Sequence, residues 1–139
     1  MGVAVERPRV RAAQAPVILL DTNALIWLHK EHARAAPLRR RSGGLYISPA
    51  SLLELQFLVE AGRLRLRPNT STAELANDPA WLLDDPSSAD WFDAALAVGW
   101  TRDPFDRLLV AHARLRGWRL ATGDTALIER LRAHERLVL

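Results

Sequence analysis

Short apolar runs alternate with helix-like stretches along this chain of 139 residues, and that alternation limits the possible folds more than any other feature. The clearest runs are PVILLD (16–21), LYIS (45–48) and WRLAT (118–122). Such runs are typical of strands buried in a parallel sheet. Strands that alternate with helices favour right-handed crossovers, with helices covering both faces of the sheet. We therefore expect an α/β fold, with three α/β/α layers and a central parallel sheet of four to five strands.

The stretches between these runs carry helix signals. Ser48 followed by Pro49 is typical of a helix start, and Gly62 and Gly117 are typical of a helix end and a turn. We expect helices over 22–33, 50–62, 70–77, 88–98 and 124–133, and from the Asp103–Asp106 turn to Arg116. We expect 80–84 and the terminal RLVL to be extended, 39–44 to be a loop, and 63–68 to be a short exposed strand or an extended loop.

The length fits one domain with a sizeable core, which we place at 17–139. Residues 1–16 lack the apolar core of a signal peptide, so we expect a flexible N-terminal extension. No apolar stretch approaches the roughly 18 residues that span a bilayer, so we expect a cytoplasmic protein without membrane contact. The absence of cysteine excludes disulfides, thiolate zinc sites and cysteine nucleophiles.

The formal net charge is +3, and Lys30 is the single lysine among nineteen basic residues. Arginine presents a planar fork that binds phosphate in a bidentate manner, so a phosphate-bearing partner is one explanation of this bias. A genome composition that favours arginine codons explains it equally well. Charge alone therefore leaves nucleic-acid binding open.

Acidic residues follow the expected strands, at the edge of the sheet where α/β proteins bind ligands. Five carboxylates from four segments are expected to converge there: Asp21, Glu54, Asp103, Asp106 and Asp124. Crowded carboxylates repel one another unless a positive charge lies among them. Oxygen ligands suit Mg²⁺ or Mn²⁺, so the pattern predicts a site for one or two divalent ions.

Each acid also has a purely structural explanation. Asp21 and Asp124 could N-cap the helices that follow them, and either Asp103 or Asp106 is expected to cap the next one. Glu54 forms an S-x-x-E capping-box pattern with Ser51, although Pro49 indicates an earlier helix start. These explanations leave unexplained why so many caps fall at the carboxyl ends of strands.

Four segments resemble the motifs of PIN-domain ribonucleases, particularly the VapC toxins of type II toxin–antitoxin pairs. These segments are ILLDTNALIWL (18–28), ISPASLLEL followed by EAGRL (47–64), TRDPFDRLLVAHA (101–113) and LATGD (120–124). They occur in the family's order, and the resemblance covers roughly 17–139. The family often has histidine where this chain has Asn23 and Thr101, and neither difference removes a carboxylate.

The resemblance implies a site and an activity. The catalytic acids would be Asp21, Glu54, Asp106 and Asp124, with Asp103 as a further acid. Thr22 and Thr122 would support the carboxylates, and Arg102 and Arg107 are candidates for phosphate binding or surface salt bridges. The implied activity is Mg²⁺- or Mn²⁺-dependent cleavage of RNA, such as tRNA or rRNA, by metal-activated water. The implied partners are a cognate antitoxin and a second copy of the chain.

Other classes fit less well. A haloacid-dehalogenase-like phosphotransferase needs an aspartate at position 23 and a late lysine, and a receiver-like domain needs the same lysine. A P-loop needs Gly-Lys-Ser/Thr, which Lys30 lacks. A PIN ribonuclease of RNA processing and a catalytically silent PIN-like interaction module remain as alternatives. His112 lies on an apolar helix and is expected to be structural.

Overall fold

The computed structural model describes residues 16–41 and 43–139. The N-terminal extension expected over 1–16 therefore lies, apart from Pro16, outside the described residues. Among the described residues, no helix combines the length and the apolar character needed to cross a membrane.

Five parallel strands form one sheet in the order β3-β2-β1-β4-β5. The strands are β1 (Ile18–Leu20), β2 (Leu45–Ile47), β3 (Leu82–Leu83), β4 (Arg119–Thr122) and β5 (Arg136–Val138). The predicted parallel α/β sheet is confirmed, with five strands. The central strand β1 pairs with both β2 and β4, and its three residues are buried.

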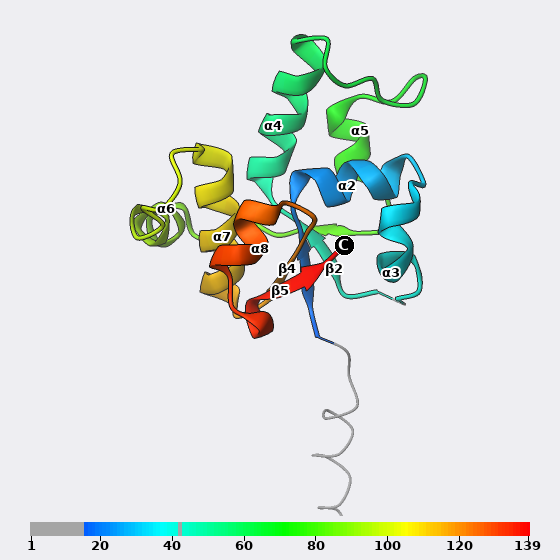
Figure 1. The fold of residues 1–139 in the computed structure, drawn as a ribbon. Coiled ribbons are helices and arrows are strands. Elements are labelled where there is room, and N and C mark those ends of the chain that lie inside the picture. The colour runs from blue at the N-terminus through cyan, green and yellow to red at the C-terminus, as the bar shows by residue number, and fades with distance from the viewer. Residues whose placement is uncertain (1–15, 42) are drawn as a thin grey trace, which may run out of the picture.

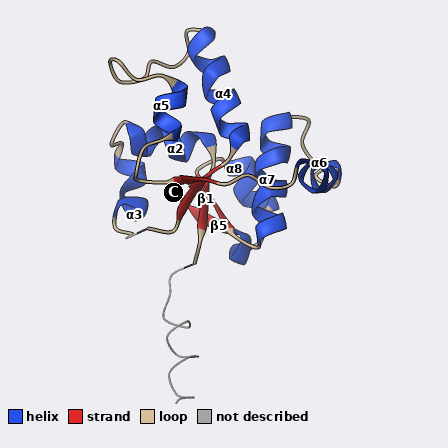
Figure 2. Ribbon diagram, turned by 180° about the vertical axis from the view of Figure 1, so that it is seen from behind, coloured by secondary structure: helices blue, strands red, loops and turns tan. Residues whose placement is uncertain are grey.

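Helices cover both faces of the sheet (Figures 1 and 2). They are α2 (Thr22–His29), α3 (Ala36–Arg39), α4 (Pro49–Glu60), α5 (Thr72–Ala76), α6 (Ser88–Leu96), α7 (Pro104–Arg116) and α8 (Thr125–Arg130). Side chains alternate along a strand, so Leu19 packs against residues of α6, α7 and α8, while Ile18 and Leu20 pack against α2, α3, α4 and α5. This gives the three expected layers. Helix α4 starts at the sheet and projects away from it (Figure 1).

Several predicted boundaries are wrong. The helix expected over 22–33 ends at His29, because Glu31 takes a positive φ of 56°, and a 3-10 turn (Ala33–Ala35) and α3 follow. The last helix ends at Arg130 rather than 133, and a second 3-10 turn (Ala133–Glu135) precedes β5. For segment 63–68 the second of the two expected structures is confirmed, because it is an extended loop without strand pairing.

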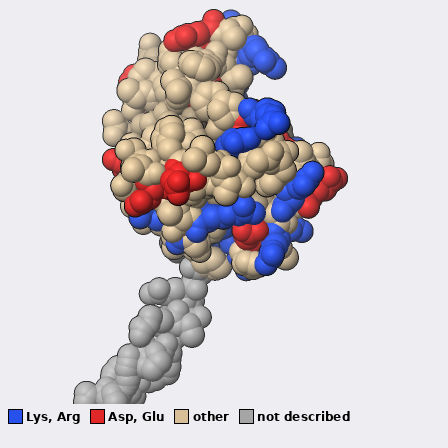
Figure 3. Space-filling model, turned by 90° about the vertical axis from the view of Figure 1, so that its left-hand side faces the viewer, with Lys and Arg blue, Asp and Glu red and all other residues tan. Residues whose placement is uncertain are grey.

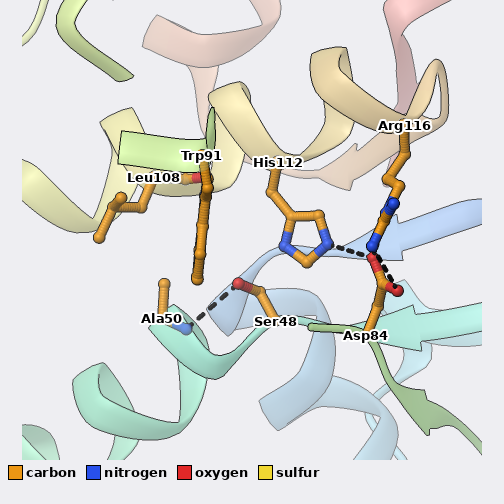
Figure 4. A network of polar contacts seen from close by, with 7 residues as sticks. All are labelled: Ser48, Ala50, Asp84, Trp91, Leu108, His112 and Arg116. Carbon is orange, nitrogen blue, oxygen red and sulfur yellow. Dashed lines mark hydrogen bonds and ion pairs between the residues drawn. The ribbon is translucent and has the colours of Figure 1, made fainter. Parts of the chain in front are cut away.

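A buried polar network fastens α7 to the end of β3 (Figure 4). His112 is fully buried, and its Nε2 lies 2.7 Å from Asp84 Oδ2. Arg116 donates to both oxygens of the same carboxylate, at 2.7 and 3.2 Å. Trp91 packs edge-on against the imidazole, with ring centroids 5.2 Å apart. These contacts agree with the structural role expected for His112.

Candidate functional site

The strand order reverses between β1 and β4, which makes this point of the sheet the favoured place for a ligand. Asp21 directly follows β1, and Asp124 lies two residues beyond β4. The backbone N–H of Asp21 donates to Ala121 O at 3.1 Å, so the ends of the two strands are held side by side. Two acids distant in sequence therefore meet at the reversal.

All five predicted acids line one hollow of about 120 Å³ at this edge. Helix α4 contributes Glu54, and the start of α7 contributes Asp103 and Asp106. Volume of this size accommodates an ion with several waters. The other lining residues are Thr22, Asn23, Leu58 and Leu109.

Three of the five acids also cap helices, as their structural explanation predicts. Asp21 Oδ1 accepts from Ala24 N at 2.7 Å at the start of α2. Asp103 Oδ1 accepts from the backbone N–H groups of Phe105 and Asp106, at 2.8 and 3.1 Å, at the start of α7. Asp124 Oδ1 caps α8 in the same way. Each cap uses only one carboxylate oxygen, so these acids can cap a helix and line the hollow together.

The capping box expected between Ser51 and Glu54 is wrong, because α4 begins at Pro49 with Ser48 as its N-cap. Glu54 instead lies one turn into the helix. Its Oε1 accepts a hydrogen bond from the Thr22 hydroxyl at 2.5 Å, and Thr22 Oγ1 lies 3.1 Å from Ser51 Oγ. A hydroxyl has one hydrogen, so Thr22 donates to the carboxylate and accepts from Ser51. Thr22 thus orients the Glu54 carboxylate, and the contact with Ser51 holds the Thr22 hydroxyl in place.

Three of the carboxylates hold their protons more tightly than isolated acids do. Burial first, and then the nearby charges of Asp103, Asp124, Glu54 and Asp21, together raise the pKa of Asp106 to about 7. Burial raises the pKa of Asp21 to about 6, although hydrogen bonds from Thr122 and Ala24 oppose the shift. Burial also raises the pKa of Glu54. No basic side chain lines the hollow among the described residues, so the excess negative charge is not neutralised from within.

The turn after β4 positions the hydroxyl of Thr122 and the carboxylate of Asp124. Thr122 Oγ1 accepts from Asp124 N at 3.0 Å, and its hydroxyl hydrogen-bonds the carboxyl of Asp21. Gly123 between them lies against the indole of Trp27, where an added Cβ would come within 2.7 Å of the ring. A side chain at position 123 would therefore require the turn or its neighbours to shift.

The structure does not bring the two candidate arginines into the hollow. Arg107 donates to Thr101 O at 2.7 Å and lines a separate apolar groove between α6 and α7. Arg102 is exposed and does not line the hollow. Both arginines are next to the acids in the sequence, but neighbouring side chains point in different directions.

Sequence reasoning assigned no site role to three lining residues. Leu58 lies four residues after Glu54, and Leu109 lies three residues after Asp106. Helical periodicity places such pairs on one helix face, so this signal could have identified both leucines. Asn23 follows Asp21 and Thr22 in the sequence, and its position in the hollow depends on where α2 begins.

The donor set of the hollow suits a hard divalent ion, because every polar group that lines it offers oxygen, with one amide nitrogen from Asn23. Within the described residues, no three acidic or histidine side chains stand close enough to hold an ion together. Mg²⁺ usually keeps several waters and binds through one or two carboxylates. The residues present therefore fit Mg²⁺ held partly through water.

Comparison with known proteins agrees with this geometry. The PIN domain family matches residues 18–133. A similar solved structure, a toxin–antitoxin complex from Klebsiella pneumoniae, has 21% identity and a TM-score of 0.57, with 78% of this chain and 87% of that chain covered. VapBC2 from Rickettsia felis, bound to a promoter DNA fragment, has 16% identity and a TM-score of 0.53 over 81% and 92%.

FitAB bound to the IR36 DNA fragment has 20% identity and a TM-score of 0.52 over 88% and 94%. A comparison with curated protein sequences gives no match. At these identities the structural neighbours establish the fold, while the family match covers most of the chain, including Asp21, Glu54, Asp106 and Asp124. The chain belongs to the PIN domain family.

Proposed function

We propose that this chain is a Mg²⁺- or Mn²⁺-dependent endoribonuclease that acts as the toxin of a toxin–antitoxin pair in the cytoplasm. The observation that carries the proposal is the convergence of five carboxylates in one hollow at the switch point of the sheet. The raised pKa values of Asp106 and Asp21 support it, because they reflect burial first and the charges of neighbouring acids second, and a divalent ion would favour the ionised carboxylates.

In this proposal Asp21 and Asp106 are the principal metal ligands, and Glu54 and Asp124 complete the site, with Asp103 beside them. A bound divalent ion lowers the pKa of a water and stabilises charge on a phosphodiester. Thr22 holds the Glu54 carboxylate through its hydroxyl, and Thr122 holds Asp21. The capping bonds of Asp21, Asp103 and Asp124 fix these side chains before substrate arrives. Arg102, exposed near the acids in sequence, is the better of the two arginines for phosphate.

The proposed partners are an RNA substrate such as tRNA or rRNA, a cognate antitoxin and a second copy of the chain. Support for the antitoxin comes from the structural neighbours, which are complexes of toxins with antitoxins. An apolar groove lined by Phe92, Leu96, Pro104 and Leu108 offers a surface for self-association. A PIN ribonuclease of RNA processing would share the carboxylate site and lack the antitoxin.

The proposal is tested by incubating the purified chain with structured RNA and Mg²⁺ or Mn²⁺. We expect internal cleavage with 3′-hydroxyl and 5′-phosphate ends. Asp21→Asn and Asp106→Asn are expected to reduce the rate at least 100-fold, because each removes a charged metal ligand. Asp93→Asn is the matched control, since Asp93 is exposed on α6 and lies outside the hollow.

Two results would contradict the proposal. Cleavage that persists in EDTA would exclude the metal mechanism. Equal rates for the parent, Asp21→Asn and Asp106→Asn would exclude the site, and a chain that binds RNA without cutting it would favour the silent interaction module.

A further inference from the structure

The loop between α4 and α5 separates its arginines from its leucines. In the segment RLRLR (63–67) the leucines at 64 and 66 pack against the buried core, while the arginines at 63, 65 and 67 are exposed. The backbone N–H groups of Arg63 and Leu64 both donate to Leu58 O, at 2.9 and 3.2 Å. The start of the loop is therefore fixed to the end of α4, with its arginines directed to the outside.

Arg63 and Arg65 line a groove of about 760 Å³ between α4 and the start of α5. The other lining residues are Gln56, Val59, Gly62, Leu64, Leu66, Thr70, Ser71 and Thr72. Three hydroxyl-bearing residues thus line the groove together with the two arginines, and no carboxylate lines it among the described residues. The adjacent Glu60 is already hydrogen-bonded to Gln56 Nε2, at 2.8 Å.

These two arginines differ from the third arginine of the segment, because Arg67 forms an ion pair with Glu31. In the part of the chain that the structure describes, the side chains of Arg63 and Arg65 make no hydrogen bond or ion pair. Two guanidinium groups without a partner, in a groove that no carboxylate lines among the described residues, form a surface suited to phosphate oxygens.

We propose that this groove binds the phosphodiester backbone of single-stranded RNA outside the acidic hollow, an inference that rests on the proposed nuclease function. Glu54 and Leu58 of α4 line the hollow, whereas Gln56 and Val59 line the groove. At about 100° per residue, these pairs lie on opposite sides of the helix. A strand that occupies both sites therefore passes around the projecting end of α4 (Figure 1).

The path between the two sites has two parts. Val59 lies five residues beyond Glu54, about 8 Å along the axis of α4, and the strand must also pass around a helix about 10 Å wide. A strand of several nucleotides covers this distance, whereas a substrate of two or three nucleotides fills the hollow alone. The groove would then add affinity for longer RNA without contributing to the chemistry.

The test measures binding of a labelled 12-nucleotide single-stranded RNA in EDTA, by fluorescence anisotropy, between 50 and 200 mM salt. Each phosphate contact contributes about 0.7 to the slope of log affinity against log salt for single strands. Arg63→Gln/Arg65→Gln is expected to reduce this slope by about 1.4, so the parent loses about sevenfold more affinity than the variant over that salt range. A trinucleotide should show a much smaller difference between the two proteins.

Arg40→Gln/Arg132→Gln is the charge-matched control, because both arginines are exposed and lie outside the groove and the hollow. It should keep the parent's slope. Equal slopes for the parent and the groove variant, or equal slopes for the two double variants, would overturn the inference. Failure of the proposed function would look different, because RNA would bind through the groove without being cut in Mg²⁺.

Discussion

At the residue scale, the acids of the hollow differ in what surrounds them. Asp103 and Asp124 each satisfy one oxygen at a helix N-terminus, whereas Asp106 accepts no hydrogen bond from the described residues. Asp106 is also the acid whose pKa rises furthest, to about 7. It therefore lacks the stabilisation that the capping acids receive, and its ionisation opposes folding.

This environment predicts a pH effect on stability. The pKa of Asp106 is higher in the folded chain than in the unfolded chain, so the folded state binds more protons between about pH 4 and 7, and stability falls as pH rises through this window. Asp106→Asn removes the effect and should raise the free energy of unfolding at pH 7.5 by on the order of 1 kcal/mol, after allowance for screening at a half-buried group. Urea unfolding in EDTA at pH 5 and 7.5 measures it. A loss of stability at pH 7.5 would contradict the prediction.

The residues packed around Gly123 limit which side chains can stand at this position. An added Cβ would approach the ring of Trp27 to 2.7 Å and would clash with the guanidinium of Arg34, so Gly123→Ala must displace the turn between Thr122 and Asp124 or these side chains. We expect a loss of 1–3 kcal/mol in unfolding free energy and a reduced cleavage rate. Gly99→Ala is the control, because nothing lies within 4 Å of its added Cβ. Equal effects at the two glycines would refute the steric explanation.

At the element scale, α7 connects the acidic hollow to the edge of the sheet. Its first turn carries Asp106, and its last turns carry His112 and Arg116, which bind Asp84 just after β3 (Figure 4). Burial lowers the pKa of His112, whose Nε2 is bonded to Asp84 and whose Nδ1 is buried without a hydrogen-bond partner among the described residues. The network therefore has one acceptor, Asp84, on which both partners depend.

Removal of that acceptor should destabilise the packing of α7. Asp84→Ala leaves the buried Nε2 of His112 without a partner, which costs about 1–3 kcal/mol of unfolding free energy. Asp84→Asn keeps an acceptor oxygen and should cost less. Asp85→Ala, at the exposed neighbour, should change stability by less than about 0.5 kcal/mol. Urea unfolding compares the three variants, and an effect of Asp85→Ala as large as that of Asp84→Ala would count against the network.

At the scale of the whole molecule, charge is unevenly placed. Five of the acids line the hollow, and the face drawn in Figure 3 carries several groups of basic side chains, some of them beside acids. An ion bound in the hollow would relieve repulsion among segments from four parts of the fold. Because the unfolded chain lacks this arrangement, binding should stabilise the fold as a whole.

This predicts that Mg²⁺ raises the melting temperature. At a concentration ten times Kd the gain is about 1.4 kcal/mol, or roughly 5 °C for a chain of this size. Asp21→Asn and Asp106→Asn should start from a higher baseline in EDTA and gain less from Mg²⁺, whereas Asp93→Asn should follow the parent. Differential scanning fluorimetry with Mg²⁺ titrated against Na⁺ at equal ionic strength measures the effect. Equal shifts in all four proteins would indicate non-specific screening.

The sequence by itself determined the class of the fold and the identity of the acids. Apolar runs between helix signals identified the strands, and the residues after those strands identified Asp21 and Asp124. Local chemistry decides these features, since strand burial and N-capping each depend on a few neighbouring residues. The end of α2 at His29 was not predicted from the sequence, because it depends on the positive φ of Glu31.

Only the tertiary structure decided how each acid is held and that the two arginines stay outside the hollow. The neighbours of β1 are set by long-range pairing, and the side of a helix that faces the hollow is set by packing against distant elements. Glu54 therefore turns to Thr22 rather than to Ser51, and Arg107 turns away from Asp106. Asp103 and Asp106 are three residues apart. Asp103 caps α7, and a helix N-terminus needs only one acceptor at that position. Asp106 is therefore left without a hydrogen bond from the described residues and has a raised pKa.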